Sequence, residues 1–292
     1  MLDDMRTAVI ARLAVAGAAI VGLAACGGAP APGAQSGTQQ TPAASSPTTP
    51  TPAPSTATTQ APNTPAPRAS STSIPGSPGI TGSLAGKDWT YIPTTRRVVA
   101  LTFDAGANAD AVPSILATLR REGVPATFFL TGNFVRDFPG AARSIAAAGF
   151  RIGDHTITHP YLTQLSDAAV QHEIAGGAQQ IMSVTGQNSA PLVRFPYGDA
   201  DARTIAIANR AGYVPVRWTV DTLGWEGTAG HISTSVVVSR VLAAARPGEI
   251  VLMHVGSNPD DHTTFDAHAL TQVISGLRDR GYAFVTLDAL TG

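Results

Sequence analysis

From about residue 95 onward, short apolar runs alternate with longer amphipathic stretches. The short runs are rich in β-branched residues, as buried strands are, and the longer ones repeat apolar residues at helical spacing. The expected strands are 98–103, 126–130, 192–195, 214–220, 249–254 and 283–287. The expected helices are 109–122, 139–148, 167–185, 201–211, 233–245 and 266–280. This alternation predicts parallel βα units, which fit an open sheet as well as a barrel.

Several polar residues stand where an expected strand runs into a loop. Asp104 follows the first strand, His254 ends the fifth, and Asp221 follows the strand at 214–220. In α/β barrels catalytic groups gather at the carboxyl ends of the strands, because the loops there vary while the packed strands stay fixed. The sequence therefore predicts a site at that edge of the sheet.

The most informative local feature is a pair of histidines, His155 and His159, four residues apart. At this spacing two imidazoles can converge on one side of a helical turn or tight loop and bind a transition metal. The same spacing also arises by coincidence, or in histidines that cap a loop. The pair becomes informative only together with the strand-end residues.

The first part of the chain has a different character. An apolar segment at 7–25 follows Arg6 and ends in small residues, which predicts a secretory signal peptide over residues 1–25. An ordinary transmembrane anchor is the alternative. Cys26, the only cysteine in the chain, stands directly after Leu23-Ala24-Ala25. This arrangement resembles the acylation site of bacterial lipoproteins, which implies cleavage before Cys26, a lipid on its thiol, and an extracytoplasmic protein anchored to the cell membrane.

Residues 26–83 are dominated by Pro, Thr, Ser, Ala and Gly, and they hold more than half of the prolines of the chain. Such a composition cannot bury a core, so a disordered tether is expected here, followed by a catalytic domain over 84–292. The formal net charge of -1, with no cluster of Lys or Arg, argues against a nucleic-acid partner. We expect a monomer.

Five ordered segments between about residues 95 and 290 resemble the sequence motifs of the NodB-type polysaccharide deacetylases, carbohydrate esterases that remove N- or O-acetyl groups from sugar polymers. The segments are Asp104-Ala105-Gly106, His155-Thr156-Ile157-Thr158-His159-Pro160, Arg194-Phe195-Pro196-Tyr197-Gly198, Asp221-Thr222-Leu223-Gly224-Trp225 and the strand that ends at His254. The resemblance implies an α/β fold, a distorted (β/α) barrel with fewer strands than the regular eight.

The resemblance also implies a role for each matching residue. His155 and His159 would bind a divalent metal, with Zn²⁺ as the expected ion. Asp104 would be the general base and His254 the general acid. Arg194 would orient the base, and the backbone N–H of Tyr197 would contribute to the oxyanion hole. Trp225 and Leu252 would surround the acetyl methyl group.

Two positions depart from the family pattern. Ala105 replaces the aspartate that usually supplies the third metal ligand, which leaves that ligand open. Asp104, Asn108 and Asp154 are the candidates to replace it. Gly224 stands where an aspartate often precedes the tryptophan and adjusts the acid histidine. Asp221 is a nearby carboxylate that could substitute.

The sequence thus predicts a metal-dependent hydrolase that removes N- or O-acetyl groups from cell-wall or other polysaccharides. Peptidoglycan is the first expected substrate, because the tether would place the domain in the wall. One alternative is a non-catalytic glycan-binding relative that has lost the third metal ligand. Another is a hydrolase of the same fold that acts on other non-peptide C–N bonds. Residues 256–266 are expected to form an exposed flap.

Overall fold

The computed structural model describes residues 79–291, so the expected signal peptide, Cys26 and most of the expected tether lie outside the described residues. The strands are β1 Val98–Ala105, β2 Ala126–Leu130, β3 Arg151–Asp154, β4 Leu192–Val193, β5 Val214–Pro215, β6 Val220–Asp221, β7 Glu249–His254 and β8 Ala283–Phe284. The helices are α1 Val112–Glu122, α2 Gly132–Asp137, α3 Pro139–Ala147, α4 Asp167–Thr185, α5 Ala202–Arg210, α6 Thr234–Ala244, α7 Phe265–Asp279 and α8 Asp288–Thr291. Within residues 79–291 no helix has both the length and the apolar character needed to cross a membrane.

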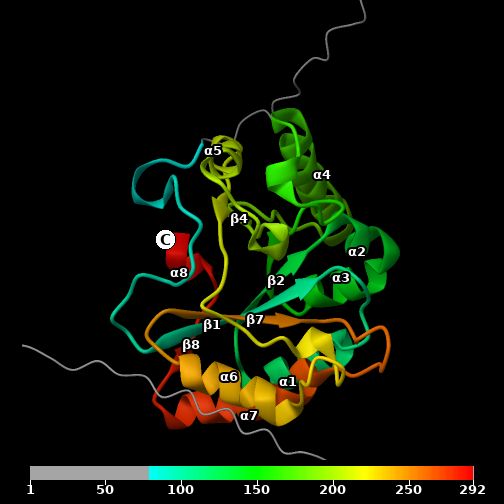
Figure 1. Ribbon diagram of the computed structural model, residues 1–292, viewed down its shortest axis with the longest axis vertical. Coiled ribbons are helices and arrows are strands. Elements are labelled where there is room, and N and C mark those ends of the chain that lie inside the picture. Colours follow the sequence, from blue (N-terminus) through cyan, green and yellow to red (C-terminus); the bar gives the residue numbers. More distant parts are fainter. Residues whose placement is uncertain (1–78, 292) are drawn as a thin grey trace, which may run out of the picture. The chain divides into compact units, whose positions relative to one another are not determined.

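The strands form one parallel sheet in the order β5-β4-β3-β2-β1-β7-β6, with β8 paired to the start of β1 (Figure 1). β5 and β6 follow each other in the chain but lie at opposite ends of this order, so the chain crosses there from one end of the sheet to the other. Trp89 lies at the crossing. Its backbone N–H donates to the carbonyl of Pro215 at 3.0 Å, and its carbonyl accepts the backbone N–H of Arg217 at 2.7 Å. The expected distorted barrel is confirmed, as a half-barrel that strand pairing does not close.

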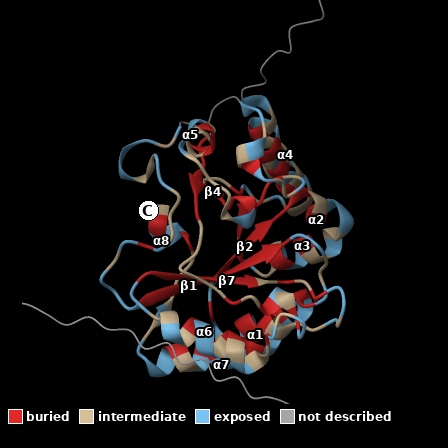
Figure 2. Ribbon diagram, viewed as in Figure 1, coloured by how far each residue is buried: buried red, intermediate tan, exposed pale blue. Residues whose placement is uncertain are grey.

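β1 is buried along its whole length, at the centre of the sheet, and separates two apolar clusters (Figure 2). Side chains alternate between the two faces of a strand. Val99, Leu101 and Phe103 accordingly pack into a large cluster with residues of α1 and α7, and Ala100 packs with Phe129 in the second cluster. The layers fix the strand ends firmly, and the polar residues of the site follow those ends.

Most elements lie where the sequence pattern places them, and β2, β7 and α4 have the predicted bounds. The pattern missed β3, which reads Arg-Ile-Gly-Asp and has no apolar run. β3 becomes a strand through its neighbours: it pairs in register with β2, and a Cβ on Gly153 would lie 2.5 Å from the ring of Phe129. The pattern also missed α2, and the single strand expected at 214–220 is two short strands, β5 and β6.

One buried carboxylate lies far from the carboxyl ends of the strands, at the start of β7. Glu249 is wholly buried, and neither of its carboxylate oxygens has a hydrogen-bond partner among the described residues. Burial raises the pKa of Glu249 to about 7. The folded protein therefore holds Glu249 protonated at acidic pH.

We expect Glu249 to make the folded state less stable as the pH rises. Between about pH 4.5 and 7 the carboxyl ionises in the unfolded chain while it stays protonated in the folded one, which favours unfolding by on the order of 3 kcal/mol at neutral pH. Urea unfolding at a series of pH values should show this decline in the wild type and not in Glu249→Gln. Glu122→Gln, at a partly exposed glutamate that pairs with Arg278, is the control. Parallel curves for wild type and Glu249→Gln would contradict the prediction.

Candidate active site

A cleft of about 610 Å³ opens at the carboxyl ends of the strands. Eight of the residues singled out from the sequence line it, namely Asp104, His155, His159, Tyr197, Asp221, Trp225, Leu252 and His254. They come from five different strand ends and the loops that follow them, and Asp104 and His254 are register partners on β1 and β7. The fold thus brings together residues that are up to 150 positions apart.

Arg194 does not line the cleft but lies wholly buried beneath it. Its Nη1 donates to Oδ1 of Asp104 at 2.7 Å, while Nε and Nη2 donate to the carbonyls of Val216 and Arg217 at 3.1 and 2.9 Å. Burial alone would raise the pKa of Asp104, but Arg194, with smaller contributions from His155 and His254, lowers it below its usual range. Asp104 is therefore ionised and oriented, as the resemblance implies for a general base.

The two histidines of the motif meet in the loop after β3. Their ring centroids are 4.7 Å apart, at an interplanar angle of 78°. Burial lowers the pKa of His155, and burial together with the charge of His155 lowers the pKa of His159 to about 4. Both rings are neutral near pH 7, which is the form that binds metal ions.

The contacts of His155 test whether this site fits a metal ion. Nδ1 lies 2.8 Å from the carbonyl oxygen of Arg194, so Nδ1 bears the proton and Nε2 has a free lone pair. That Nε2 lies 3.4 Å from Oδ2 of the ionised Asp104. A cation bound by both atoms would remove the repulsion between their lone pairs, and a histidine nitrogen with a carboxylate oxygen is a donor set that zinc accepts. The donor set fits a divalent metal.

The structure narrows the choice of a third ligand. Oδ1 of Asp154 accepts the N–H of Thr156 and faces α4, outside the cleft, and the amide of Asn108 is used by the backbone N–H and carbonyl of Ser257. Neither Asp154 nor Asn108 lines the cleft, whereas Asp104 does, so the structure favours Asp104 among the three candidates. Ala105 belongs to the apolar cluster on the opposite face of β1. Within residues 79–291 no three His, Cys, Asp or Glu side chains form a ready-made metal cluster.

The histidine loop is clamped from two sides by residues that the sequence analysis missed. Oε2 of the buried Glu173, on α4, accepts the N–H groups of Ile157 and Thr158, both at 2.9 Å. On the other side, the N–H groups of Gly132 and Asn133 at the start of α2 donate to loop carbonyls. The sequence signal that could have identified Glu173 is its position on the buried face of the helix expected at 167–185, because a buried charge needs hydrogen-bond partners.

Gly177 explains why α4 tolerates a glycine pair in its interior. A Cβ at Gly177 would lie 2.3 Å from Oδ1 of Asp154 and 2.9 Å from the carbonyl group of Thr156, so the helix and the histidine loop approach each other through the missing side chain. Glycine otherwise costs a helix interior about 1 kcal/mol relative to alanine. The close approach offsets that cost.

We predict that Gly177→Ala destabilises the fold by about 1–3 kcal/mol, because the added methyl overpacks against backbone atoms of the loop. Helix propensity alone predicts the opposite sign. Zinc affinity should fall by about 10-fold, since the loop holds both histidines. Urea unfolding and zinc titration are the measurements. Gly140→Ala, at a helical glycine with no atom near its Cβ position, is the control. Wild-type stability in Gly177→Ala would contradict the close approach of α4 to the histidine loop.

His254, Trp225 and Leu252 line the other side of the cleft, with the His254 and Trp225 rings 6.2 Å apart. Burial alone would lower the pKa of His254, but Asp266, with smaller contributions from Asp104 and Asp221, raises it above its usual value. The expected flap at 256–266 is in part wrong, because Ser257 and Asp266 are buried and Gly256, Ser257 and Pro259 line the cleft.

Aromatic side chains form the rim beside the histidines. Tyr161 stacks on Tyr197 with ring centroids 4.1 Å apart, and Tyr197 meets His159 edge-on at 4.6 Å. Tyr161 and Tyr197 are 47% and 54% exposed, so the parts of the two rings that do not stack on each other are open to a ligand. Tyr197 and His159 both have left-handed φ values, of 60° and 62°, a strained conformation that marks functional loops.

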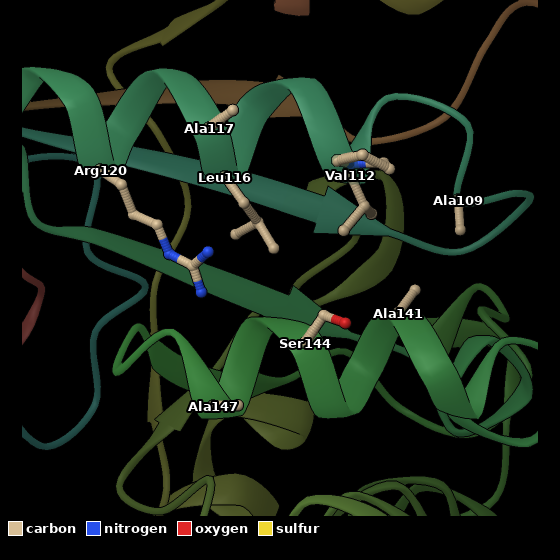
Figure 3. Close-up of a pocket in the computed structure, with 9 residues that line it drawn as sticks. Ala109, Val112, Leu116, Ala117, Arg120, Ala141, Ser144 and Ala147 are labelled. Carbon is tan, nitrogen blue, oxygen red and sulfur yellow. The ribbon is translucent and has the colours of Figure 1, made fainter.

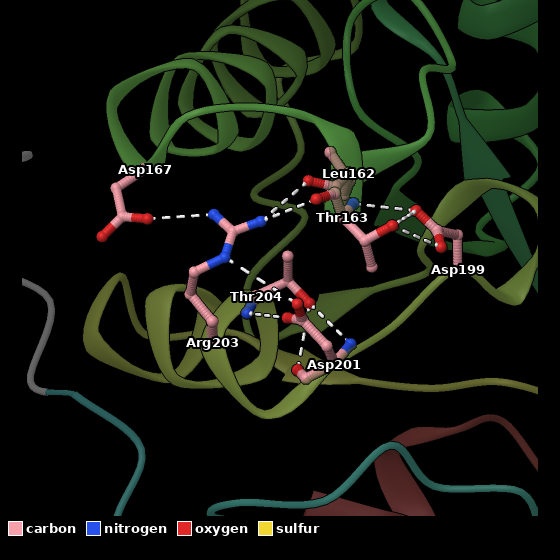
Figure 4. A network of polar contacts seen from close by, with 7 residues as sticks. All are labelled: Leu162, Thr163, Asp167, Asp199, Asp201, Arg203 and Thr204. Carbon is pink, nitrogen blue, oxygen red and sulfur yellow. Dashed lines mark hydrogen bonds and ion pairs between the residues drawn. The ribbon is translucent and has the colours of Figure 1, made fainter.

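A polar network behind this rim fixes its backbone. Arg203 contacts Asp167, Asp201 and the carbonyl of Thr163, and Asp199 accepts the N–H and hydroxyl of Thr163 (Figure 4). Asp199 lies two residues after Tyr197, and Thr163 two residues after Tyr161. The network therefore ties together the two segments that present the tyrosines.

A second hollow, of about 550 Å³, lies between α1 and α3 (Figure 3). Its walls are mostly alanine, valine and leucine side chains, and Arg120 is its one charged residue. It has no histidine, aspartate or glutamate. Asp104, Asp221 and the histidines singled out from the sequence belong to the first cleft.

A parallel half-barrel with an Arg-held aspartate, a histidine pair and a further histidine at one cleft defines a hydrolase site. A family model described as "Polysaccharide deacetylase" matches residues 91–216. A peptidoglycan-N-acetylglucosamine deacetylase of Bacillus cereus is 32% identical over 198 residues, 68% of this chain and 70% of the relative. A chitooligosaccharide deacetylase of Rhizobium leguminosarum bv. trifolii is 36% identical over 202 residues, 65% of this chain and 90% of the relative.

This chain therefore belongs to the polysaccharide deacetylase family, whose named relatives are hydrolases, and the resemblance to that family is confirmed. Among solved structures, a mutant of a CE4 family pseudoenzyme with restored enzymatic activity superposes with a TM-score of 0.61 at 29% identity, covering 68% of each chain. The family thus includes a relative described as a pseudoenzyme. The alternative of a non-catalytic relative stays relevant for this chain.

Proposed function

We propose that this protein hydrolyses acetyl groups from acetylated sugars of a polysaccharide, with the help of a divalent metal. The observation that supports the proposal is the placement of an ionised, Arg-held Asp104 between the histidine pair and His254 in one cleft. Acetyl hydrolysis needs a base for the attacking water, stabilisation of the oxyanion, and an acid for the departing amine or alcohol. The chain has a candidate for each.

The chemistry divides among residues that surround the acetyl group. Asp104 accepts a proton from the attacking water, and His254 donates a proton to the leaving nitrogen or oxygen of the sugar. The backbone N–H of Tyr197 is the candidate donor to the developing oxyanion, and Leu252 and Trp225 receive the methyl group. A divalent ion held by His155 and His159, with zinc as the expected ion, would polarise the acetyl carbonyl and lower the pKa of the attacking water.

The aromatic rim favours a sugar over a small cyclic amide as substrate. The exposed faces of Tyr161 and Tyr197 offer a flat apolar surface of the kind that packs against a sugar ring. Two relatives are named for deacetylation of peptidoglycan and of chitooligosaccharides, and both of these polymers are built of sugar rings. Peptidoglycan is the first expected substrate, because the proposed lipid anchor would hold the domain close to the cell wall.

The competing function is glycan binding without catalysis. It is favoured by Ala105, which packs among apolar side chains and supplies no ligand, and by the lack of a ready-made three-ligand cluster within residues 79–291. Acetate release separates the two functions. Release from peptidoglycan or chitin oligomers that depends on added Zn²⁺ supports the enzyme, and binding of these polymers with no release at any metal concentration supports the binder.

We predict that Asp104→Asn and His254→Ala each lower the turnover by about 10²–10⁴-fold, the usual weight of general acid–base catalysis. Acetate release from chitin oligomers under saturating zinc is the measurement. Zinc content should be unchanged in His254→Ala. If Asp104→Asn loses its zinc, Asp104 is a metal ligand and the proposed base is wrong.

The histidine pair gives a separate prediction. His155→Ala and His159→Ala should abolish tight zinc binding while the protein stays folded, because the rings supply the two nitrogen ligands. Elemental analysis and circular dichroism test the two halves of this statement. His172→Ala, at a histidine on α4 that does not line the cleft, is the control. Full zinc content in both variants would refute the site.

We propose further that the mature protein is held at the outer face of the cell membrane by a lipid on Cys26. The support is the sequence pattern, with an apolar segment that ends in Leu-Ala-Ala before the only cysteine of the chain. A Pro-rich stretch between Cys26 and the domain would let the cleft reach the surrounding wall. This location is the argument for peptidoglycan.

Cys26→Ser should release the protein from the membrane fraction or leave it unprocessed, because the lipid needs the thiol. Fractionation of cells and mass spectrometry of the N-terminal peptide are the measurements. Arg68→Gln, a change within the same stretch, should leave membrane association unaltered. An unmodified Cys26 still joined to Ala25 in cells would contradict the proposal.

A further inference from the structure

The ring of His254 has a neighbour on its far side that no strand-end motif provides. Asp266, in the first turn of α7, is 3% exposed, and its Oδ2 accepts the backbone N–H of His254 at 2.8 Å. The same oxygen lies 3.7 Å from Nδ1 of the imidazole. Nδ1 of His254 and Oδ1 of Asp266 are both buried, and neither has a hydrogen-bond partner among the described residues.

These two unpaired atoms are complementary. A ring N–H is a donor and a carboxylate oxygen an acceptor, and a small rotation of the imidazole would shorten the 3.7 Å between Nδ1 of His254 and Oδ2 of Asp266 to hydrogen-bond length. Catalytic hydrogen bonds are often long in the free enzyme and tighten when substrate binds. With Nδ1 turned to Asp266, Nε2 is the ring nitrogen left for a substrate in the cleft.

The room for this carboxylate comes from Gly224. A Cβ at position 224 would lie 2.3 Å from Oδ1, 2.4 Å from Cγ and 2.7 Å from Oδ2 of Asp266, so a side chain at 224 and the observed Asp266 exclude each other. All three contacts are with one carboxylate. A substituent at Gly224 would therefore occupy the same point in space, reached from the η4 turn (Gly224–Glu226) instead of from α7.

Asp221, the other carboxylate on this wall, is engaged differently. Its Oδ1 accepts the N–H of Leu223 at 2.9 Å and so shapes the turn that precedes Gly224. Asp266, in contrast, has no hydrogen bond to the free N–H groups of its own helix, although it lies in the first turn of α7. Its one hydrogen bond among the described residues is to His254.

We infer that Asp266 is the positioning residue of His254, and that the glycine at 224 is required because its missing side chain leaves the space for that carboxylate. Asp266 holds the imidazole with Nδ1 turned inward and Nε2 toward the substrate, and it does not itself touch the reacting atoms. The kinetic consequence rests on the proposed deacetylase function, whereas the orientation of the ring does not.

The test is a double-mutant cycle on positions 224 and 266. Asp266→Asn and Asp266→Ala should lower kcat by about 10- to 100-fold with KM little changed, the usual cost of losing a partner that orients a functional histidine. Gly224→Ala should also lower kcat, because its methyl displaces Asp266. Gly224→Asp combined with Asp266→Ala should regain at least about 10-fold over Asp266→Ala, because the carboxylate returns to the same point.

Two readouts separate positioning from a merely structural role. Zinc content and thermal unfolding of Asp266→Asn should match the wild type, and Asp288→Asn, in the first turn of α8, should leave kcat unchanged. ¹⁵N NMR of the histidine rings should show a change in the Nδ1 and Nε2 signals of His254 in Asp266→Asn, and their return in the double variant.

The outcomes are distinct. Wild-type kcat and unchanged His254 signals in Asp266→Asn would overturn the inference, as would the absence of any rescue by Gly224→Asp. If the wild type itself releases no acetate, the proposed function fails, and the ¹⁵N signals alone decide whether Asp266 orients the ring.

Discussion

The buried contact between Arg194 and Asp104 is the interaction on which the site depends. Three of the hydrogen bonds of Arg194 connect β1 to the backbone after β5, and the carbonyl of Arg194 fixes the ring of His155. A buried charge without a partner costs much free energy of folding. Removal of either residue would therefore leave the other as an unpaired buried charge. One ion pair thereby sets the charge of the base and the orientation of the first histidine.

The rest of the site lies on loops whose strained backbone conformations are held in place by neighbouring elements. The histidine loop has a left-handed Thr156 and His159, and it is held by Glu173 and by the start of α2. Two close approaches made possible by glycine, Gly177 beneath that loop and Gly224 beside Asp266, show the same device on the two sides of the cleft. In both cases the missing side chain lets a carboxylate lie where it orients neighbouring groups.

The cleft also departs from the motif pattern that the family resemblance implies. The histidine pair and the Arg-held aspartate are present, but the residue after that aspartate is an alanine packed into the apolar cluster. The nearest carboxylate to the histidine nitrogens is then Asp104 itself, at 3.4 Å. The same carboxylate is the candidate for proton transfer and for charge balance at the metal, and the two roles compete.

The sequence by itself determined the fold class, the family and the residues at the strand ends. The signals for these features are local: apolar runs that alternate with amphipathic stretches, and short motifs of particular residue types. Such local patterns can be recognised in the sequence alone. It did not show β3 or α2, because both are stabilised by neighbours and not by their own pattern. Only the tertiary structure placed Asp154 and Asn108 outside the lining of the cleft, and brought Glu173 and Asp266 to the site from helices distant in the chain. Side-chain direction and close approach depend on how elements pack, and a linear pattern does not encode either.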